Sequence, residues 1–278
     1  MVTSQDLVIA TWWETIPVAE AMGAGPVIHF CQGFEGDLIH LAPVWPRIEE
    51  VYRRPLPAFV VSAHLGELLR TRFGRESFEV RPPLDPLFKP AWRFGPGRRP
   101  FVMVPGIFEA EVKGIRNALA AIRILREQGL PCRVHRLSIL PLSEEERVLL
   151  PPDIYRCGIA PTQVAREMRH CDLLMFPSLS MEGFGLPVIE AMASGVPVVA
   201  SDIPALRSLA EHAITKVPVA DPRALADAAG RLLRERSVWR AARRSGLDAA
   251  RAFEPAAVAE RLEAAVRWAE GAVKGAAS

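Results

Sequence analysis

The sequence predicts an α/β protein with two domains, each built around a parallel sheet. Apolar runs typical of buried strands alternate with helical segments through residues 1–92. A cluster of Pro, Gly and Arg at residues 93–100 then interrupts the pattern, as domain linkers do. Beyond it, Leu173–Phe176 is continuously apolar, like a strand covered on both faces, and a Gly-rich loop and a helix follow. Such alternation is typical of α/β folds.

In the N-terminal domain, hydrophobic periodicity locates the elements. We expect strands at Leu7–Thr11, Val27–Cys31, Phe59–Ser62 and Phe78–Arg81, and helices at Arg47–Tyr52 and Leu65–Phe73.

Ligands of open parallel sheets bind beyond the carboxyl ends of the strands, which here points to the loops after the first two strands. Trp13 follows the first strand, and Gln32 and Glu35 follow the second. A Trp ring can stack on a sugar, and Glu35 or Asp37 can take a proton from an acceptor hydroxyl. The alternative stays open that the tandem Trp residues belong to the core and the carboxylates only solvate a loop.

The stretch PSLSMEGFGLPVIEAMASGVPVVAS is the most informative of the C-terminal domain. Gly183 and Gly185 allow the backbone to approach a ligand, and a following helix at residues 187–194 offers its N–H groups to phosphate. Pro187 suits the start of this helix and Gly195 its left-handed end, before a strand at Val196–Ser201. Glu182 and Glu190 flank the loop and accept from neutral hydroxyls. A nucleotide sugar fits this arrangement.

The Glu182-x7-Glu190 spacing around Gly-Phe-Gly-Leu-Pro resembles the signature of retaining glycosyltransferases of the GT-B type, family four. The likeness extends from Phe101 to about Ala269. It implies a fold of two Rossmann-like domains facing a cleft. It also implies that Glu182 contacts the donor sugar, that Glu190 contacts the ribose, and that the diphosphate is held by Gly183, Phe184, Gly185 and Leu186.

A second motif matches less well. The family usually follows the first strand of this domain, here Phe101–Pro105, with Gly-Arg and then a Lys that together clamp the diphosphate. Gly106 and Lys113 are present, but Ile107 takes the place of the arginine. Loss of a cation removes electrostatic stabilisation from the leaving group. Arg116, one helical turn beyond Lys113, either compensates or is an ordinary exposed helix residue.

These assignments give domains at residues 1–92 and 101–252, a linker at 93–100, and a terminal helical segment, 253–278, that returns toward the first domain. Because each half of such a fold needs roughly 150 residues, we expect the N-terminal domain to be incomplete. An uncovered sheet edge drives association, so we also expect a homo-oligomer. The last helix, Pro255–Glu270, is expected to bury Val258, Leu262, Val266 and Ala269.

The resemblance implies transfer of a sugar from a nucleotide diphosphate sugar to a hydroxyl of a saccharide or lipid-linked acceptor, with retention of configuration. Lys113 and the Gly-rich loop would hold the leaving diphosphate, and Glu182 would orient the sugar. The sequence contains no Asp-x-Asp, which favours a metal-independent enzyme with no cofactor besides the donor substrate. The alternative is a non-catalytic nucleotide-sugar-binding or scaffold protein. The sequence argues against a Rossmann oxidoreductase, because no Gly-x-Gly-x-x-Gly follows the first strand.

Composition favours a cytoplasmic enzyme. Half of the 278 residues are hydrophobic, and the formal net charge of +2 gives no signal for nucleic acid. Cys31, Cys132, Cys157 and Cys171 lack metal-ligand spacing and are expected to be reduced core thiols. The Arg-rich segment 231–251 is either a solvated helix or a face for peripheral contact with anionic membranes.

Overall fold

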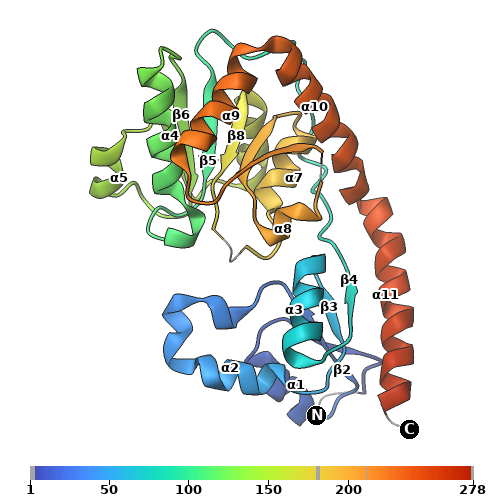
Figure 1. The fold of residues 1–278 in the computed structure, drawn as a ribbon. Helices are drawn as coiled ribbons and strands as arrows, with labels where there is room; N and C mark the ends of the chain where they lie inside the picture. The colour runs from blue at the N-terminus through green and yellow to red at the C-terminus, as the bar shows by residue number, and fades with distance from the viewer. Residues whose placement is uncertain (1–3, 180–181, 211, 277–278) are drawn as a thin grey trace. The chain divides into compact units, whose positions relative to one another are not determined.

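The chain folds into two compact units, each of which holds one parallel sheet. The computed structural model describes residues 4–179, 182–210 and 212–276. The first unit comprises residues 1–83 and 255–278, and the second comprises residues 84–254 (Figure 1). The segment 93–100, expected as a linker, lies within the second unit. The α/β prediction with two parallel-sheet domains is confirmed.

The sheet of the first unit has four parallel strands in the order β1-β2-β3-β4. Each strand is short, and helices connect it to the next. In chain order the elements are β1 (Val8–Ala10), α1 (Thr15–Met22), β2 (Val27–Cys31), the 3-10 turns η1 (Glu35–Asp37) and η2 (Ile39–Val44), α2 (Trp45–Tyr52), β3 (Ala58–Val60), α3 (Ala63–Phe73) and β4 (Ser77–Glu79).

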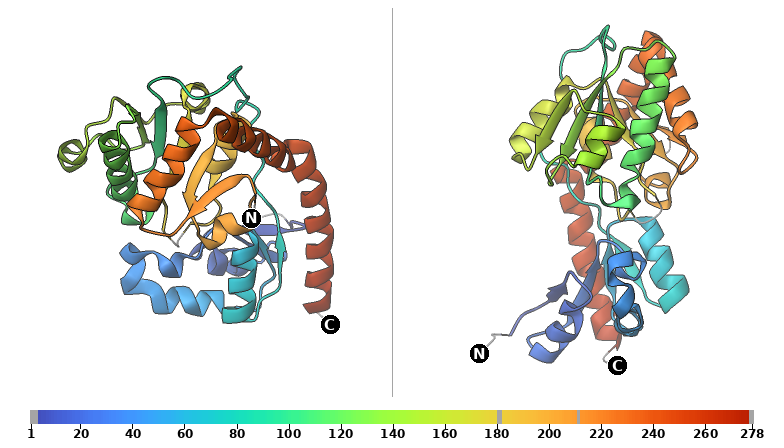
Figure 2. Two further views of the ribbon diagram at one scale, coloured as in Figure 1. Left: turned by 45° about the horizontal axis from the view of Figure 1, so that its top comes forward. Right: turned by 90° about the vertical axis from the view of Figure 1, so that its left-hand side faces the viewer.

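Helix α11 (Pro255–Ala276) packs on this same sheet, as Figures 1 and 2 show from three sides. Trp268 lies 6.3 Å from Phe59 and 5.8 Å from Phe78, measured between ring centroids. Ala265 and Ala269 are fully buried in the same cluster. The prediction of which face of α11 is buried was partly wrong, because the side chains of Leu262 and Val266 are 45% and 38% exposed. Small residues let the helix approach the sheet, so the two larger aliphatic side chains lie outside the contact.

The second unit contains a parallel sheet of six strands in the order β10-β9-β8-β5-β6-β7. Its elements are β5 (Phe101–Pro105), η3 (Glu111–Lys113), α4 (Ile115–Glu127), β6 (Arg133–Ser138), α5 (Glu144–Leu149), β7 (Ile154–Cys157), α6 (Pro161–His170), β8 (Leu173–Phe176), α7 (Leu186–Ala193), β9 (Val198–Ser201), α8 (Pro204–Arg207), β10 (Ile214–Val217), α9 (Pro222–Arg234), α10 (Arg236–Ala250) and η4 (Arg251–Phe253).

Strand order locates the ligand-binding edge of this unit. The chain adds β6 and β7 on one side of β5, then returns to place β8, β9 and β10 on the other side. The order therefore reverses between β5 and β8, and in open α/β sheets ligands bind beyond the carboxyl ends of the strands at such a switch point. The loops after Pro105 and Phe176 meet there.

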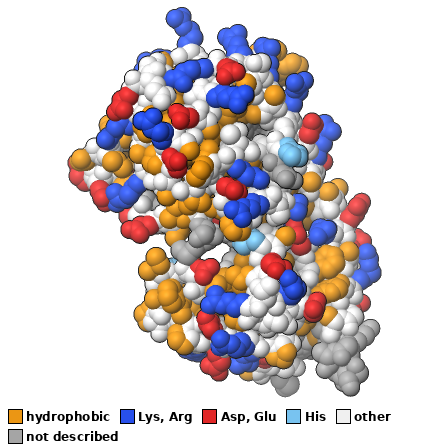
Figure 3. Space-filling model, in the orientation of Figure 1, with side chains coloured by type: hydrophobic (Ala, Val, Ile, Leu, Met, Phe, Trp, Pro, Cys, Tyr) orange, Lys and Arg blue, Asp and Glu red, His pale blue; other side chains and the backbone are white. Residues whose placement is uncertain are grey.

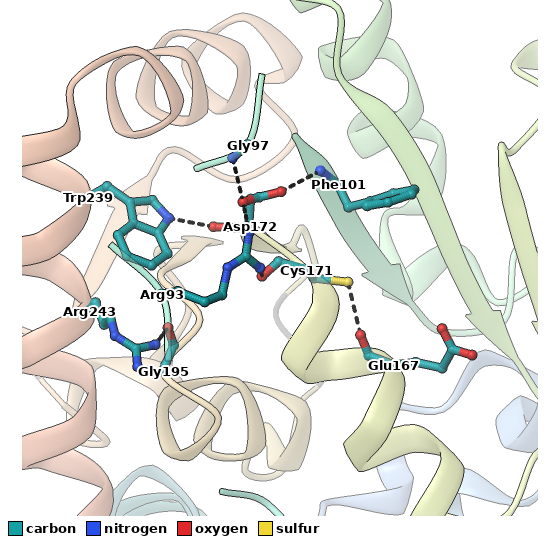
Figure 4. A network of polar contacts seen from close by, with 9 residues as sticks. All are labelled: Arg93, Gly97, Phe101, Glu167, Cys171, Asp172, Gly195, Trp239 and Arg243. Carbon is teal, nitrogen blue, oxygen red and sulfur yellow. Dashed lines mark hydrogen bonds and ion pairs between the residues drawn. The ribbon is translucent and has the colours of Figure 1, made fainter. Parts of the chain in front are cut away.

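Asp172, which immediately precedes β8, fixes the segment before β5 within the second unit (Figure 4). Its carboxylate accepts from the Arg93 guanidinium and from the backbone N–H groups of Gly97 (3.0 Å) and Phe101 (2.8 Å). The Trp239 indole N–H donates to the Asp172 carbonyl at 2.7 Å. This segment is therefore anchored to the unit rather than a free tether.

Several local expectations are confirmed and others corrected. The strands Val27–Cys31, Phe101–Pro105 and Leu173–Phe176 are observed with the expected bounds, and Gly195 has a φ of +69°. Helix α7 begins one residue earlier than expected, which moves Glu190 beyond its first turn. Cys157 is exposed, unlike the other three cysteines, because the end of β7 lies at the sheet edge.

Candidate functional site

The loop after β5 and the loop after β8 are joined directly at the switch point. The Leu179 N–H donates to the Val112 carbonyl at 2.7 Å. Gly114 has a φ of +61°, and a Cβ there would lie 2.1 Å from the Pro177 carbonyl oxygen. Only glycine permits this close approach without displacement of the backbone. The sequence thus brings Lys113, just before Gly114, beside the loop that carries Glu182.

Lys113 and Glu182 form an ion pair at this junction. The Lys113 ammonium donates to Glu182 Oε2 at 2.9 Å, and the Ser178 hydroxyl donates to the same oxygen at 3.3 Å. The side chain of Lys113 is 35% exposed and that of Glu182 is 15% exposed. The pair offers a cation for a phosphate and a carboxylate oxygen for neutral hydroxyls, side by side and accessible from solvent.

The Gly-rich loop turns directly into α7. Gly185 has a φ of +100°, a region that side-chain-bearing residues rarely adopt. Phe184 is buried and lies edge-on to Phe253 with ring centroids 5.8 Å apart, so it anchors the loop. Leu186, the first residue of α7, is 45% exposed. The loop is thereby fixed with the N-terminus of α7 open to a ligand, where N–H groups and the helix dipole favour an anion.

Glu190 lies in α7, partly buried, and carries a perturbed carboxyl group. Burial, with a smaller contribution from the nearby Asp85 carboxylate, raises the pKa of Glu190 to about 7. A carboxyl with this pKa accepts or donates a hydrogen bond depending on pH. Groups with such shifts concentrate at functional sites.

An apolar pocket of about 290 Å³ adjoins Lys113 at the carboxyl ends of β5, β6 and β7. Ile107 supplies part of its wall, in the position where a cation was expected. Its full lining is Pro105, Gly106, Ile107, Lys113, Leu137, Ser138, Ile139, Gly158, Ile159 and Val164. The residues after β6 and β7 were not singled out from the sequence, because aliphatic side chains in loops carry no motif.

Arg136 was also missed from the sequence. This fully buried residue of β6 donates to the Gly106 carbonyl at 2.9 Å, to the Val104 carbonyl and to the Glu146 carboxylate. It therefore fixes the backbone where β5 turns into the Lys113 loop. The Ser143 hydroxyl accepts from the Glu146 N–H at 3.2 Å, while the Glu146 side chain accepts from Arg136.

Arg116 does not supply the second cation, because other residues hold its side chain. Its guanidinium pairs with Glu145 at 2.6 Å and lies over the Phe108 ring at 4.3 Å from the centroid. Both contacts hold it along α4 and α5.

The three residues assigned to an acceptor lie in the first unit in different environments. Trp13 is 3% exposed, and Arg47 lies over its ring at 5.5 Å from the centroid. Glu35 is 5% exposed, accepts from the Tyr52 hydroxyl, and has a pKa that burial raises. Gln32 is exposed. Of the three, Gln32 is open to solvent, while Glu35 and Trp13 are buried.

Within residues 4–179, 182–210 and 212–276, no cluster of three or more His, Cys, Asp or Glu side chains is arranged to hold a metal ion. Over the same ranges, none of the helices combines the length and apolar character that a membrane crossing requires.

Residues 99–235 match the family model described as glycosyl transferases group 1. Phosphatidyl-myo-inositol mannosyltransferase of Mycobacterium leprae is 37% identical over 100 residues, which cover 35% of this chain and 27% of that protein. D-inositol 3-phosphate glycosyltransferase of Nocardia farcinica is 33% identical over 159 residues, 56% of this chain and 30% of that protein. The chain thus spans less than half the length of these relatives.

Solved structures of similar fold cover nearly the whole chain. Sucrose-phosphate synthase from Thermosynechococcus elongatus superposes with a TM-score of 0.79 at 20% identity, over 98% of this chain and 74% of that one. Anabaena HepE in complex with UDP-glucose gives a TM-score of 0.75 at 17% identity, over 93% of this chain and 79% of that one. These likenesses establish the fold.

Proposed function

Because residues 99–235 form a domain of the glycosyl transferases group 1 family on a GT-B fold, we propose that the protein transfers a sugar from a nucleotide diphosphate sugar to an acceptor hydroxyl. The Lys113–Glu182 pair is the observation that carries this proposal. It places one cation and one hydroxyl-accepting carboxylate at the switch point, beside the N-terminus of α7.

The donor would bind across this edge of the second unit. Lys113 and the N–H groups at the start of α7 hold the diphosphate, and Glu182 accepts from sugar hydroxyls. Glu190 accepts from the ribose. The apolar pocket beside Ile107 takes the base, since a flat ring needs apolar walls more than charge. The UDP-glucose complex of HepE makes UDP-glucose the first donor to test.

Transfer would proceed with retention of configuration and without a metal ion. The acceptor oxygen bonds to the anomeric carbon on the face from which the diphosphate departs. The bond from that carbon to the phosphate oxygen breaks, and the acceptor's proton passes to the departing phosphate. Lys113 stabilises the charge that develops there. The acceptor would be a saccharide or a lipid-linked acceptor, and the name phosphatidyl-myo-inositol mannosyltransferase indicates a lipid acceptor for one relative.

The test compares Glu182→Gln with the wild type for donor binding by calorimetry and for transfer or slow donor hydrolysis. We expect turnover to fall roughly a hundredfold, while the donor dissociation constant changes little. Glu145→Gln is the matched control, because it breaks a surface ion pair to Arg116 of similar length, 2.6 Å. Equal losses of binding and turnover in the Glu182 variant would refute its assigned role.

A non-catalytic nucleotide-sugar-binding protein is the second candidate. Ile107 and the engagement of Arg116 with Glu145 leave Lys113 without the partner cation that the resemblance implies. This candidate predicts donor binding with no hydrolysis and no transfer to any acceptor of a broad panel. Measuring both binding and hydrolysis of uridine, guanosine, thymidine and adenosine diphosphate sugars distinguishes this candidate from the proposed enzyme.

A further inference from the structure

Two aromatic side chains project from the second unit at the edge opposite the proposed donor site. Trp92 is 93% exposed and Phe94 is 70% exposed. They precede β5, so they lie at the amino ends of the strands, whereas Lys113 and Glu182 lie at the carboxyl ends. Large aromatic side chains at such exposure are costly in water and mark interaction sites when they gather.

The backbone that carries these rings is fixed. The Ala91 carbonyl accepts from Arg243 at 2.6 Å, the Phe94 carbonyl accepts from Arg240 at 2.7 Å, and Arg93 is held by Asp172 (Figure 4). Arg93 points inward while its two neighbours point outward, as alternate residues of an extended segment do. The exposure of Trp92 and Phe94 is therefore built into the fold.

Several arginines lie near the two rings. Arg166 and Arg169 of α6 line a hollow of about 560 Å³ together with Trp92. Arg236 of α10 lies against Gly95, so close that a Cβ on this glycine would lie 3.1 Å from its side chain. Figure 3 shows basic side chains gathered over this end of the unit. The Trp92 patch comprises Trp92, Phe94, Arg98, Arg99, Arg166, Arg169, Arg236 and Arg240.

None of the arginines of the Trp92 patch forms an ion pair within the part of the chain that the structure describes, although ion pairs occupy many arginines elsewhere. The whole chain has a formal net charge of only +2, so this cationic region is local. A local positive field with projecting aromatic rings matches the chemistry of an anionic lipid surface, where Trp inserts at the headgroup level and each Arg near the surface adds attraction.

We propose that the Trp92 patch docks the protein onto anionic membranes. A single-stranded nucleic acid would need a groove lined by stacking rings, whereas Trp92 and Phe94 stand out from the surface. The proposal is independent of the proposed transfer reaction, since vesicle binding is measured without donor or acceptor.

The experiment is cosedimentation of the full chain with phosphatidylglycerol/phosphatidylcholine vesicles and with phosphatidylcholine vesicles alone. We expect binding to the anionic vesicles only, and release by salt. Trp92→Ala/Phe94→Ala and Arg98→Glu/Arg99→Glu should each lower the partition coefficient roughly tenfold or more. The matched controls Val18→Ala/Val148→Ala and Arg147→Glu/Arg223→Glu change exposed residues elsewhere and should bind like the wild type.

A second readout reports the insertion of Trp92 itself. Brominated lipids should quench the tryptophan fluorescence of the wild type, and Trp92→Phe should lose most of that quenching while it still binds. Unchanged binding by both patch variants would overturn the proposal. So would retention on heparin without binding to anionic vesicles, which would instead identify a soluble polyanion as the partner.

Discussion

Donor affinity should depend on pH through Glu190. With a pKa of about 7, this carboxyl is ionised in about a tenth of molecules at pH 6 and in about nine tenths at pH 8. If the ribose hydroxyls bind the carboxylate, affinity for a nucleotide diphosphate sugar should rise by up to roughly tenfold between these pH values. Glu190→Gln should bind with an affinity that is nearly flat over the same range.

The assay is calorimetric titration of UDP-glucose from pH 6 to pH 8. A nucleotide sugar is preferable to free UDP, because its diphosphate has no terminal phosphate that titrates near pH 6. Asp85→Asn is the informative second variant. Asp85 contributes to the raised pKa of Glu190, so its neutralisation should move the midpoint of the profile to lower pH. A midpoint that stays in place in Asp85→Asn, or equal pH profiles for Glu190→Gln and the wild type, would refute the reasoning.

The same group links stability to pH. The pKa of Glu190 is raised on folding from 4.5 to about 7, so the folded state binds the proton more tightly than the unfolded chain. The favourable contribution of the protonated group is complete below pH 4.5 and is lost as pH rises toward 7. Glu190→Gln should therefore unfold at higher denaturant concentration than the wild type at pH 8, with the difference shrinking near pH 5.

Three other predictions follow from the fold. Arg136→Met leaves Glu146 buried without its partner and should cost about 3–5 kcal/mol in denaturant unfolding, whereas Arg136→Met/Glu146→Leu should recover most of that loss. Gly114→Ala forces a Cβ to within 2.1 Å of the Pro177 carbonyl, so donor affinity in calorimetry should fall far more than for Gly129→Ala, where a Cβ meets nothing within 4 Å. A homo-oligomer remains a prediction, for which sedimentation velocity of the full chain should show a dimer or larger species; a monodisperse monomer would contradict it.

Much of the fold follows from patterns in the sequence that physics constrains strongly. Continuously apolar segments such as Leu173–Phe176 are typical of a strand covered on both faces, and Gly195 ends α7 as a left-handed residue. The buried face of helix α11 was harder to predict, since Leu262 and Val266 also satisfy helical periodicity. Its contact is instead made by alanines and Trp268, a choice set by how closely the helix approaches the sheet.

The site could be predicted only in part from the sequence. A motif identifies the residues that contact a ligand, but it does not identify the residues that position them. Glu182 and Lys113 were predicted separately, and the structure brings them to 2.9 Å. Glu35 appeared as an acceptor-side base, yet its carboxylate is buried against Tyr52, a partner 17 residues away that no local pattern connects to it. Such long-range pairs appear only once the chain has folded.

Ile107 changes which groups can neutralise the charge of a bound diphosphate. Where a second cation was expected, an aliphatic side chain lines the pocket beside Lys113, so Lys113 alone among the predicted cations faces the donor edge. Its ammonium is already held by Glu182, and a bound diphosphate must share it with that carboxylate. The N–H groups at the start of α7 then carry a larger part of the phosphate charge, and their placement depends on Gly185 and on the buried Phe184. The electrostatics of this site rest on backbone geometry as much as on side-chain charge.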